Sequence, residues 1–152
     1  MQQIQEGSFL KATTLLNETI FEGTTIFITE YNDKGTVGCI VNKAFGRSIN
    51  ELSEFAYVPE FPLYNGGPVA TEYLFFIHQA PGIIAGGKMV KDGVYVSGSF
   101  KQAIEALCKK QVDENDLKIF VGYCGWDSGQ LEGEIEEGSW EVINESAVFA
   151  FE

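Results

Sequence analysis

Alternating apolar and polar positions predict several short strands along the chain. Residues 25–31 alternate and are rich in β-branched and aromatic side chains, which is typical of a half-buried strand. Residues 32–35 are polar and end in glycine, so they predict a hairpin turn, and residues 36–43 predict the return strand. The same pattern predicts further strands at 72–79, 94–97, 117–123, 140–144 and 148–151.

Helical periodicity is confined to short segments. The clearest helix follows Ser99, where apolar side chains recur at the spacing of one buried face: Phe100, Ala103, Ile104, Leu107 and Cys108. Ser48 and Glu51 form a capping-box pair that predicts a short helix as far as about residue 55. A turn is expected at 124–126, followed by a helix that Asp127 and Gln130 cap and that ends near residue 138. Strands outnumber helices without strict alternation, which indicates an α+β fold or a mixed sheet.

Composition indicates one compact domain over residues 1–152. The chain has 152 residues, of which 45% are hydrophobic, and a formal net charge of −12. A globule of this length can bury roughly 70% of the surface of its unfolded chain. The negative charge disfavours direct nucleic-acid binding, because phosphate backbones would be repelled. The chain also lacks a basic stripe and a convincing helix-turn-helix.

The acidic charge is concentrated toward the end of the chain. Residues 119–152 contain eight acidic residues and no lysine or arginine. Such a segment is commonly a solvated face. It is also suited to docking a basic protein partner or, more weakly, a divalent cation.

Other sequence features point to a cytoplasmic protein with no cofactor. The three cysteines, Cys39, Cys108 and Cys124, form no paired motif, so neither a disulfide framework nor a structural zinc site is expected. No signal peptide is recognised, and the longest apolar run is too short to span a membrane. The chain has no metal-binding motif, and neither of the common glycine-rich phosphate-binding motifs occurs.

A set of glycine-rich motifs resembles the AlgH/YqgE family of bacterial proteins. They are Gly7-Ser8-Phe9-Leu10, the Gly35–Asn42 hairpin, Gly66-Gly67-Pro68-Val69, Phe76-Ile77-His78, the run Gly122–Ile135 and Trp140. The resemblance covers almost the whole chain, and the Gly-Tyr-x-Gly-Trp-x-x-Gly-Gln-Leu-Glu run is its most specific part. Thr13-Thr14 and Lys43-Ala44 depart from the family pattern, which weakens the transfer of a site near Asn42.

The resemblance implies a fold but no established activity. The family fold is a strongly bent mixed sheet that forms a small barrel flanked by a few short helices. Its members carry the label of transcriptional regulators, although no molecular function is established for the family. If this chain influences transcription, we expect it to act through a protein partner.

The run Gly122–Ile135 is the main candidate for a recognition surface. Gly125, Gly129 and Gly133 would share one side of a helix, where close approach of another backbone would explain them. Tyr123 and Trp126 would offer aromatic surface at a turn. The full set of candidate ligand-binding or partner-binding residues is Asn42, Gly66, Gly67, His78, Tyr123, Gly125, Trp126, Gln130 and Glu132.

His78 decides between a binding domain and an enzyme. It is the only histidine, so any Ser-His-Asp or Cys-His scheme must use it. None of the possible nucleophiles stands at a diagnostic spacing, and Gly-x-Ser-x-Gly is absent. We therefore expect a non-catalytic regulatory or protein-interaction domain. The alternative is a small-ligand-binding protein or hydrolase-type enzyme with a cleft around His78 and residues 122–130. The sequence gives neither the ligand nor the oligomeric state.

Overall fold

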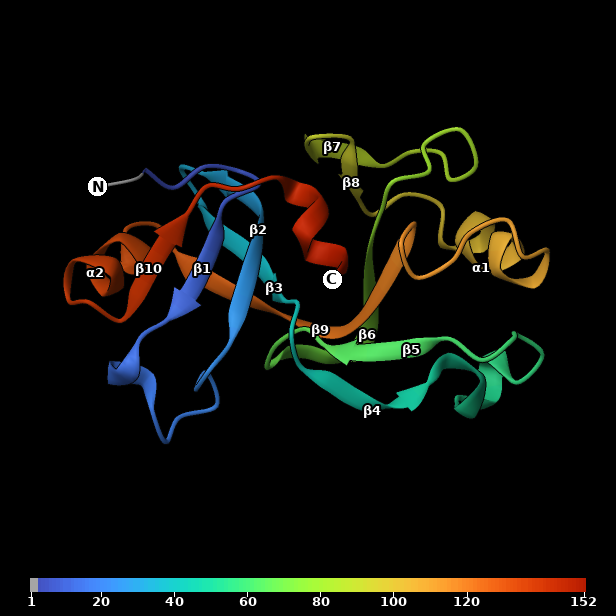
Figure 1. Ribbon diagram of the computed structural model, residues 1–152, viewed down its shortest axis with the longest axis horizontal. Coiled ribbons are helices and arrows are strands. Elements are labelled where there is room, and N and C mark those ends of the chain that lie inside the picture. Colours follow the sequence, from blue (N-terminus) through green and yellow to red (C-terminus); the bar gives the residue numbers. More distant parts are fainter. Residues whose placement is uncertain (1–2) are drawn as a thin grey trace.

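The computed structural model describes residues 3–152 and contains one strongly bent, ten-stranded sheet (Figure 1). The strands are β1 (Phe9–Ala12), β2 (Thr25–Asn32), β3 (Gly35–Ile40), β4 (Ala44–Ser48), β5 (Pro62–Asn65), β6 (Val69–His78), β7 (Lys88–Lys91), β8 (Val94–Val96), β9 (Leu117–Asp127) and β10 (Trp140–Ile143). The helices are α1 (Phe100–Cys108) and α2 (Gln130–Glu136), with 3-10 helices η1 (Thr14–Leu16), η2 (Ile49–Glu51), η3 (Ser53–Phe55) and η4 (Ala147–Phe151). The fold class is α+β, as the strand-rich pattern predicted.

The sheet is mixed and open. Its main order is β10-β1-β2-β3-β9-β6-β8-β7, and β5 joins β4 to β9. All pairings are antiparallel except that of β5 with β9. Within residues 3–152, the outer strands β10 and β7 do not pair with each other. The small barrel expected from the family resemblance is therefore wrong, because closure requires the two edges to meet.

Strand β9 holds the two halves of the sheet together. Its first part pairs with β6 and, in parallel, with β5, while its last part pairs with β3. In Figure 1 the half with β1, β2, β3, β10 and α2 therefore lies on one side of β9, and the half with β4 to β8 and α1 lies on the other. The expected turn at 124–126 is wrong, since these residues continue β9 to Asp127.

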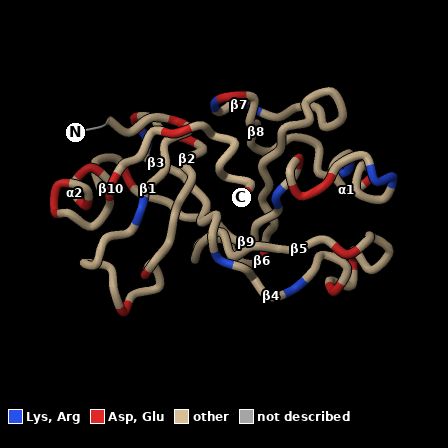
Figure 2. The backbone as a smooth tube through the Cα atoms, viewed as in Figure 1, with Lys and Arg blue, Asp and Glu red and all other residues tan. Residues whose placement is uncertain are grey.

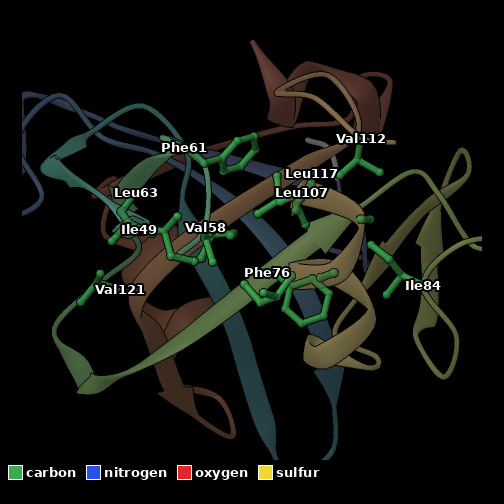
Figure 3. Packing of buried hydrophobic residues seen from close by; sticks show 14 residues of the cluster. Ile49, Val58, Phe61, Leu63, Phe76, Ile84, Leu107, Val112, Leu117 and Val121 are labelled. Carbon is green, nitrogen blue, oxygen red and sulfur yellow. The ribbon is translucent and has the colours of Figure 1, made fainter. Parts of the chain in front are cut away.

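Three apolar clusters fill the faces of this bent sheet. One lies between α1, η2 and the β5–β9–β6 strands and contains Ile49, Phe76 and Leu107 (Figure 3). A second lies between α2 and the β10–β1–β2–β3 strands. The third occupies the concave inner face, where Phe27 and Phe120 pack with η4. Residues 148–151, expected as a strand, belong to this 3-10 helix, whose Ala147 and Ala150 are fully buried.

The predicted hairpin and main helix are confirmed, whereas the helix expected from Ser48 to residue 55 is wrong. Ser99 caps α1 by accepting a hydrogen bond from the Gln102 N–H at 3.2 Å. The Ser48–Glu51 capping pair is present, with the Ser48 N–H donating to Glu51 Oε2 at 2.6 Å. It starts only η2, because the backbone is extended again at Leu52 and η3 then follows separately. Gly129, rather than Asp127, is the N-terminal cap of α2.

Glycines let two backbone segments cross closely at the centre of the sheet. A Cβ on Gly66 would meet the Gly122 carbonyl oxygen, and one on Gly67 would meet the Tyr123 carbonyl group. Gly67 and Gly122 have φ values of +148° and +74°, which side chains rarely tolerate. The close approach expected for Gly129 and Gly133 is wrong, since a Cβ at either position meets no described atom within 4 Å.

Candidate functional site

The candidate residues predicted from the sequence occupy four places rather than one site. Asn42 lies after β3, where its side chain accepts from the Thr25 N–H and donates to the Gly23 carbonyl, both at 2.9 Å. Gly66 and Gly67 belong to the backbone crossing at Gly122. His78 is the last residue of β6, and the remaining candidates lie in the last part of β9 and the first turn of α2. The Asn42 side chain therefore links the segment after β3 to the turn that precedes β2.

Trp126 packs inside the protein and offers little surface to a partner. Its side chain is only 8% exposed and contacts Trp140 edge-to-face with ring centroids 6.1 Å apart. Both indole N–H groups donate to the same oxygen, Glu134 Oε1, at 3.1 and 3.0 Å. Gln130 donates to the other oxygen of Glu134 at 3.2 Å and also accepts from the Asp127 N–H. Trp126 therefore lacks the exposed aromatic surface that a turn at 124–126 was expected to give it.

Glu134 organises this network, yet the sequence did not single it out as a site residue. It lies on the half-buried side of α2, one helical turn after Gln130. The signal that could have found it is the presence of two apolar tryptophans, each carrying one N–H that must be satisfied when buried. Glu132, on the exposed face of α2, accepts from the Tyr31 hydroxyl at 2.8 Å. This hydrogen bond raises the pKa of Tyr31 above its ordinary value.

His78 lies in surroundings unsuited to general-base catalysis. It is fully buried, and its ring lies near those of Phe76 and Tyr95, with centroid distances of 5.9 and 5.5 Å. Nδ1 accepts from the Ala80 N–H at 3.1 Å, so Nε2 carries the proton of the neutral ring. Nε2 has no described partner of good hydrogen-bond geometry. Burial lowers the pKa of His78, and the nearby Ser97 backbone offsets part of this effect.

Neither cysteine near the candidate residues behaves as a nucleophile. Cys124 and Cys39 are buried free thiols on β9 and β3. Burial raises the pKa of Cys124 to about 12 and raises that of Cys39 further. Both sulfurs therefore stay protonated near neutral pH, and the structure forms no Cys-His pair around His78. Within residues 3–152, no three histidine, cysteine or acidic side chains converge to hold a metal ion.

Lys118 is a buried cation that sequence reasoning missed. It is only 3% exposed, and its Nζ donates to the Val41 carbonyl at 2.6 Å and the Ala150 carbonyl at 2.9 Å. The ammonium also lies 4.2 Å from the centre of the Tyr64 ring. Burial lowers the pKa of Lys118 to about 8. The sequence signal that could have identified it is its position inside the apolar run 117–123. Such a run is typical of a strand that is covered on both faces, so a lysine within it is expected to be buried.

Replacing Lys118 with methionine is expected to change how stability depends on pH. In the unfolded chain lysine titrates near its ordinary pKa, whereas the folded pKa is about 8. Above about pH 8 the folded state thus binds fewer protons than the unfolded state, and Lys118 contributes stability that increases with pH. The wild type should gain about 1 kcal/mol relative to Lys118→Met between about pH 7 and pH 9, as measured by urea unfolding.

The comparison with a variant is necessary because Cys39 and Cys124 act in the opposite direction. Their raised pKa values make the folded state lose stability as pH rises above the ordinary thiol pKa. Burial is the main cause of this loss and is common to wild type and Lys118→Met, so most of the loss cancels in the difference. Lys101→Met, which removes an exposed lysine of α1, controls for the change in net charge. If the difference in unfolding free energy between wild type and Lys118→Met stayed constant from about pH 7 to pH 9, the lowered pKa of Lys118 would be contradicted.

Two of the concave surfaces of the protein each combine a mostly apolar lining with charged residues at its border. The first, which we call the α2 groove, has a volume of about 690 Å³ and lies between the start of the chain, α2 and β10. Its lining includes four half-buried apolar or aromatic side chains and two exposed carboxylates: Ile4, Tyr31, Ile135, Val142, Glu132 and Glu136. The second, which we call the inner cleft, has a volume of about 460 Å³ and is lined by residues of β2, β3, β6, β8 and β9, including Tyr123.

The open bent sheet, its two short α-helices and the glycine crossing define the class of the protein as a single α+β domain. The family model described as DUF179, AlgH-like, matches residues 9–152. The chain therefore belongs to the AlgH-like family, as its glycine-rich motifs indicated. Among the described residues, no helix has the length and apolar character required to cross a membrane.

Relatives and solved structures agree with this assignment. A UPF0301 protein of Chlorobium limicola is 34% identical over 150 residues, which cover 98% of this chain and 80% of the relative. A UPF0301 protein of Parabacteroides distasonis is 34% identical over 139 residues, or 90% of this chain and 70% of the relative. The solution structure of AlgH from Pseudomonas aeruginosa matches with a TM-score of 0.79 and 25% identity, covering 100% of this chain and 85% of that one. A crystal structure from Corynebacterium diphtheriae, 21% identical, shares the fold with a TM-score of 0.76 and covers 96% of this chain and 78% of that one.

Proposed function

We propose that this protein is a non-catalytic interaction domain that docks a basic segment of a protein partner in the α2 groove. The observation that carries the proposal is the combination of an apolar floor with two carboxylates and no basic side chain among the described lining residues. A partner segment with apolar side chains on one face and lysine or arginine beside them would match both features. A regulatory role, including one in transcription, would then follow from the partner.

The distribution of charge supports this choice of surface. Figure 2 shows acidic residues gathered around α2, at the far end of the molecule from α1. Glu132 and Glu136 lie one helical turn apart, and their like charges repel in the free protein. A bound cation would relieve this repulsion. The free thiols Cys39, Cys108 and Cys124 are in keeping with a reducing compartment, which supports a cytoplasmic location.

The enzyme alternative receives no specific support. It required His78 within hydrogen-bond reach of a thiol or hydroxyl in an open pocket. His78 is instead fully buried next to two aromatic rings, and its Nδ1 accepts a hydrogen bond from the Ala80 N–H.

The proposal can be tested with a synthetic amphipathic peptide of leucine and lysine. The double variant Glu132→Gln/Glu136→Gln should weaken binding about fivefold in isothermal titration calorimetry, because it removes two partly exposed charge contacts. The control Glu54→Gln/Glu105→Gln makes the same change in net charge at exposed positions outside the α2 groove. Equal weakening by both double variants would show only general attraction to an acidic protein and would overturn the proposal.

A further inference from the structure

The inner cleft is a second concave site, separate from the α2 groove, on the concave face of the bent sheet. Cys39, Ile77 and Phe120 belong both to its lining and to the buried cluster that packs under η4. The cleft therefore continues the inner apolar core to the surface. Its volume of about 460 Å³ lies in the range of small-molecule sites, which are typically concave and mostly apolar.

Two backbone irregularities direct side chains into this cleft. The register of β2 and β3 shifts between Ile28 and Glu30, so Thr29 is the extra residue of a bulge. Thr29 is 5% exposed and lines the cleft. On β9, the left-handed Gly122 changes the strand's alternation, so Phe120 and Tyr123, three residues apart, both line the cleft. Bulges next to binding sites commonly re-aim side chains in this way.

The walls of the cleft present an aromatic surface with free hydroxyl groups. Phe75 and Tyr123 contact each other edge-to-face, with ring centroids 5.1 Å apart, and both are half-buried. Ser97 also lines the cleft, with a φ of +63°, a strained conformation for a residue with a side chain. Neither the Tyr123 nor the Ser97 hydroxyl has a hydrogen-bond partner among the described residues. Both are available to a ligand.

The charged residues of the cleft favour a ligand with a positive charge. Lys88 and Glu30 are the charged residues of its lining. Lys88 is neutralised by Glu6, whose Oε2 lies 3.0 Å from Nζ. The Glu30 carboxylate accepts only from the Asn32 amide, at 3.4 Å, and has no basic partner in the part of the chain that the structure describes. Glu30 is exposed and thus contributes an uncompensated negative charge to the lining of the cleft. The aromatic rings of the same lining also attract cations.

We propose that the inner cleft binds a small organic cation: an amine whose apolar body packs against Phe75 and Tyr123 and whose ammonium group pairs with Glu30. The cleft then serves as a ligand site that acts independently of the α2 groove. The ring of a primary amine would pack against the aromatic wall, and its ammonium group would pair with the Glu30 carboxylate and donate to the free hydroxyls.

The test uses phenethylamine as the probe in an amide-resolved NMR titration of the whole protein. We expect saturable shifts at Thr29, Val37, Ser97 and Tyr123 with a dissociation constant on the order of millimolar, in keeping with so small a ligand. The matched probes 3-phenylpropionate and 2-phenylethanol carry the same ring with a negative and a neutral end. We expect each to bind at least about fivefold more weakly than the amine.

Two variants locate the charge preference. In Glu30→Gln, the affinity for phenethylamine should fall to that for 2-phenylethanol. Glu72→Gln, which lies outside the inner cleft, should still bind the amine more tightly than the alcohol. The proposal is overturned if no probe shifts these amides saturably up to its solubility. It is also overturned if the carboxylate or the alcohol binds as tightly as the amine, or if Glu30→Gln leaves the preference unchanged.

Discussion

Replacing Gly67 with alanine is expected to destabilise the protein by at least about 3 kcal/mol. A Cβ at this position would overlap the Tyr123 carbonyl group and lie 2.7 Å from the Cys124 nitrogen. Both obstacles are backbone atoms of the central strand β9, which cannot rotate away as a side chain can. The φ of +148° adds conformational strain. Urea unfolding should show a large fall in the midpoint or a chain that no longer folds.

Gly133→Ala is the matched control for this prediction. Gly133 lies within α2, and a Cβ there meets no described atom within 4 Å. Alanine should therefore stabilise the protein by about 0.5–1 kcal/mol, since glycine is a poor helix former. If Gly67→Ala unfolded at the same urea concentration as wild type, the two backbones would not need their close contact.

Replacing Glu134 with alanine should lower the free energy of unfolding by about 3 kcal/mol, because two buried indole N–H groups lose a charged acceptor. Trp126 and Trp140 are 8% and 3% exposed, so water cannot readily replace the carboxylate without opening the packing beneath α2. These are the only two tryptophans in the chain. Their fluorescence therefore reports this site directly, and the emission maximum should move to longer wavelength.

Glu134→Gln provides the conservative comparison. The amide retains one oxygen that can accept from both indoles, so most of the stability should return. A fluorescence spectrum and unfolding midpoint for Glu134→Ala equal to those of wild type would show that the two hydrogen bonds contribute nothing to the fold.

Local signals in the sequence predicted the parts of the fold that form between near neighbours. The hairpin of β2 and β3 depends on the turn residues between them, and α1 depends on its own apolar face and on Ser99. The predicted strand 117–123 is shorter than β9 because residues 124–126 have the sequence of a turn. They stay in the strand because they pair with β3, which is distant in the sequence. The C-terminal residues 148–151 have the composition of a strand, but they belong to η4, which buries Ala147 and Ala150 against the inner apolar cluster instead of pairing with a strand.

The candidate site was less predictable because its residues act through distant partners. The sequence identified glycines that permit close contact, but the contact is made by Gly66, Gly67 and Gly122 rather than along α2. Trp126 looked suited to recognition because a turn would have exposed it. The roles of the Glu134 carboxylate and of the buried Lys118 ammonium depend on partners that only the folded structure brings close. Residue spacing in the sequence does not reveal these partners.

The placement of β9 has a consequence for the order in which the chain can fold during synthesis. The half containing β4 to β8 and α1 is built from one contiguous stretch, residues 44–121. The other half needs β1, β2 and β3 together with α2 and β10, which are separated by that stretch. On the ribosome, β1, β2 and β3 can pair with one another and the middle of the chain can assemble, but β1 and β3 lack their remaining partners until the end of β9 and β10 emerge.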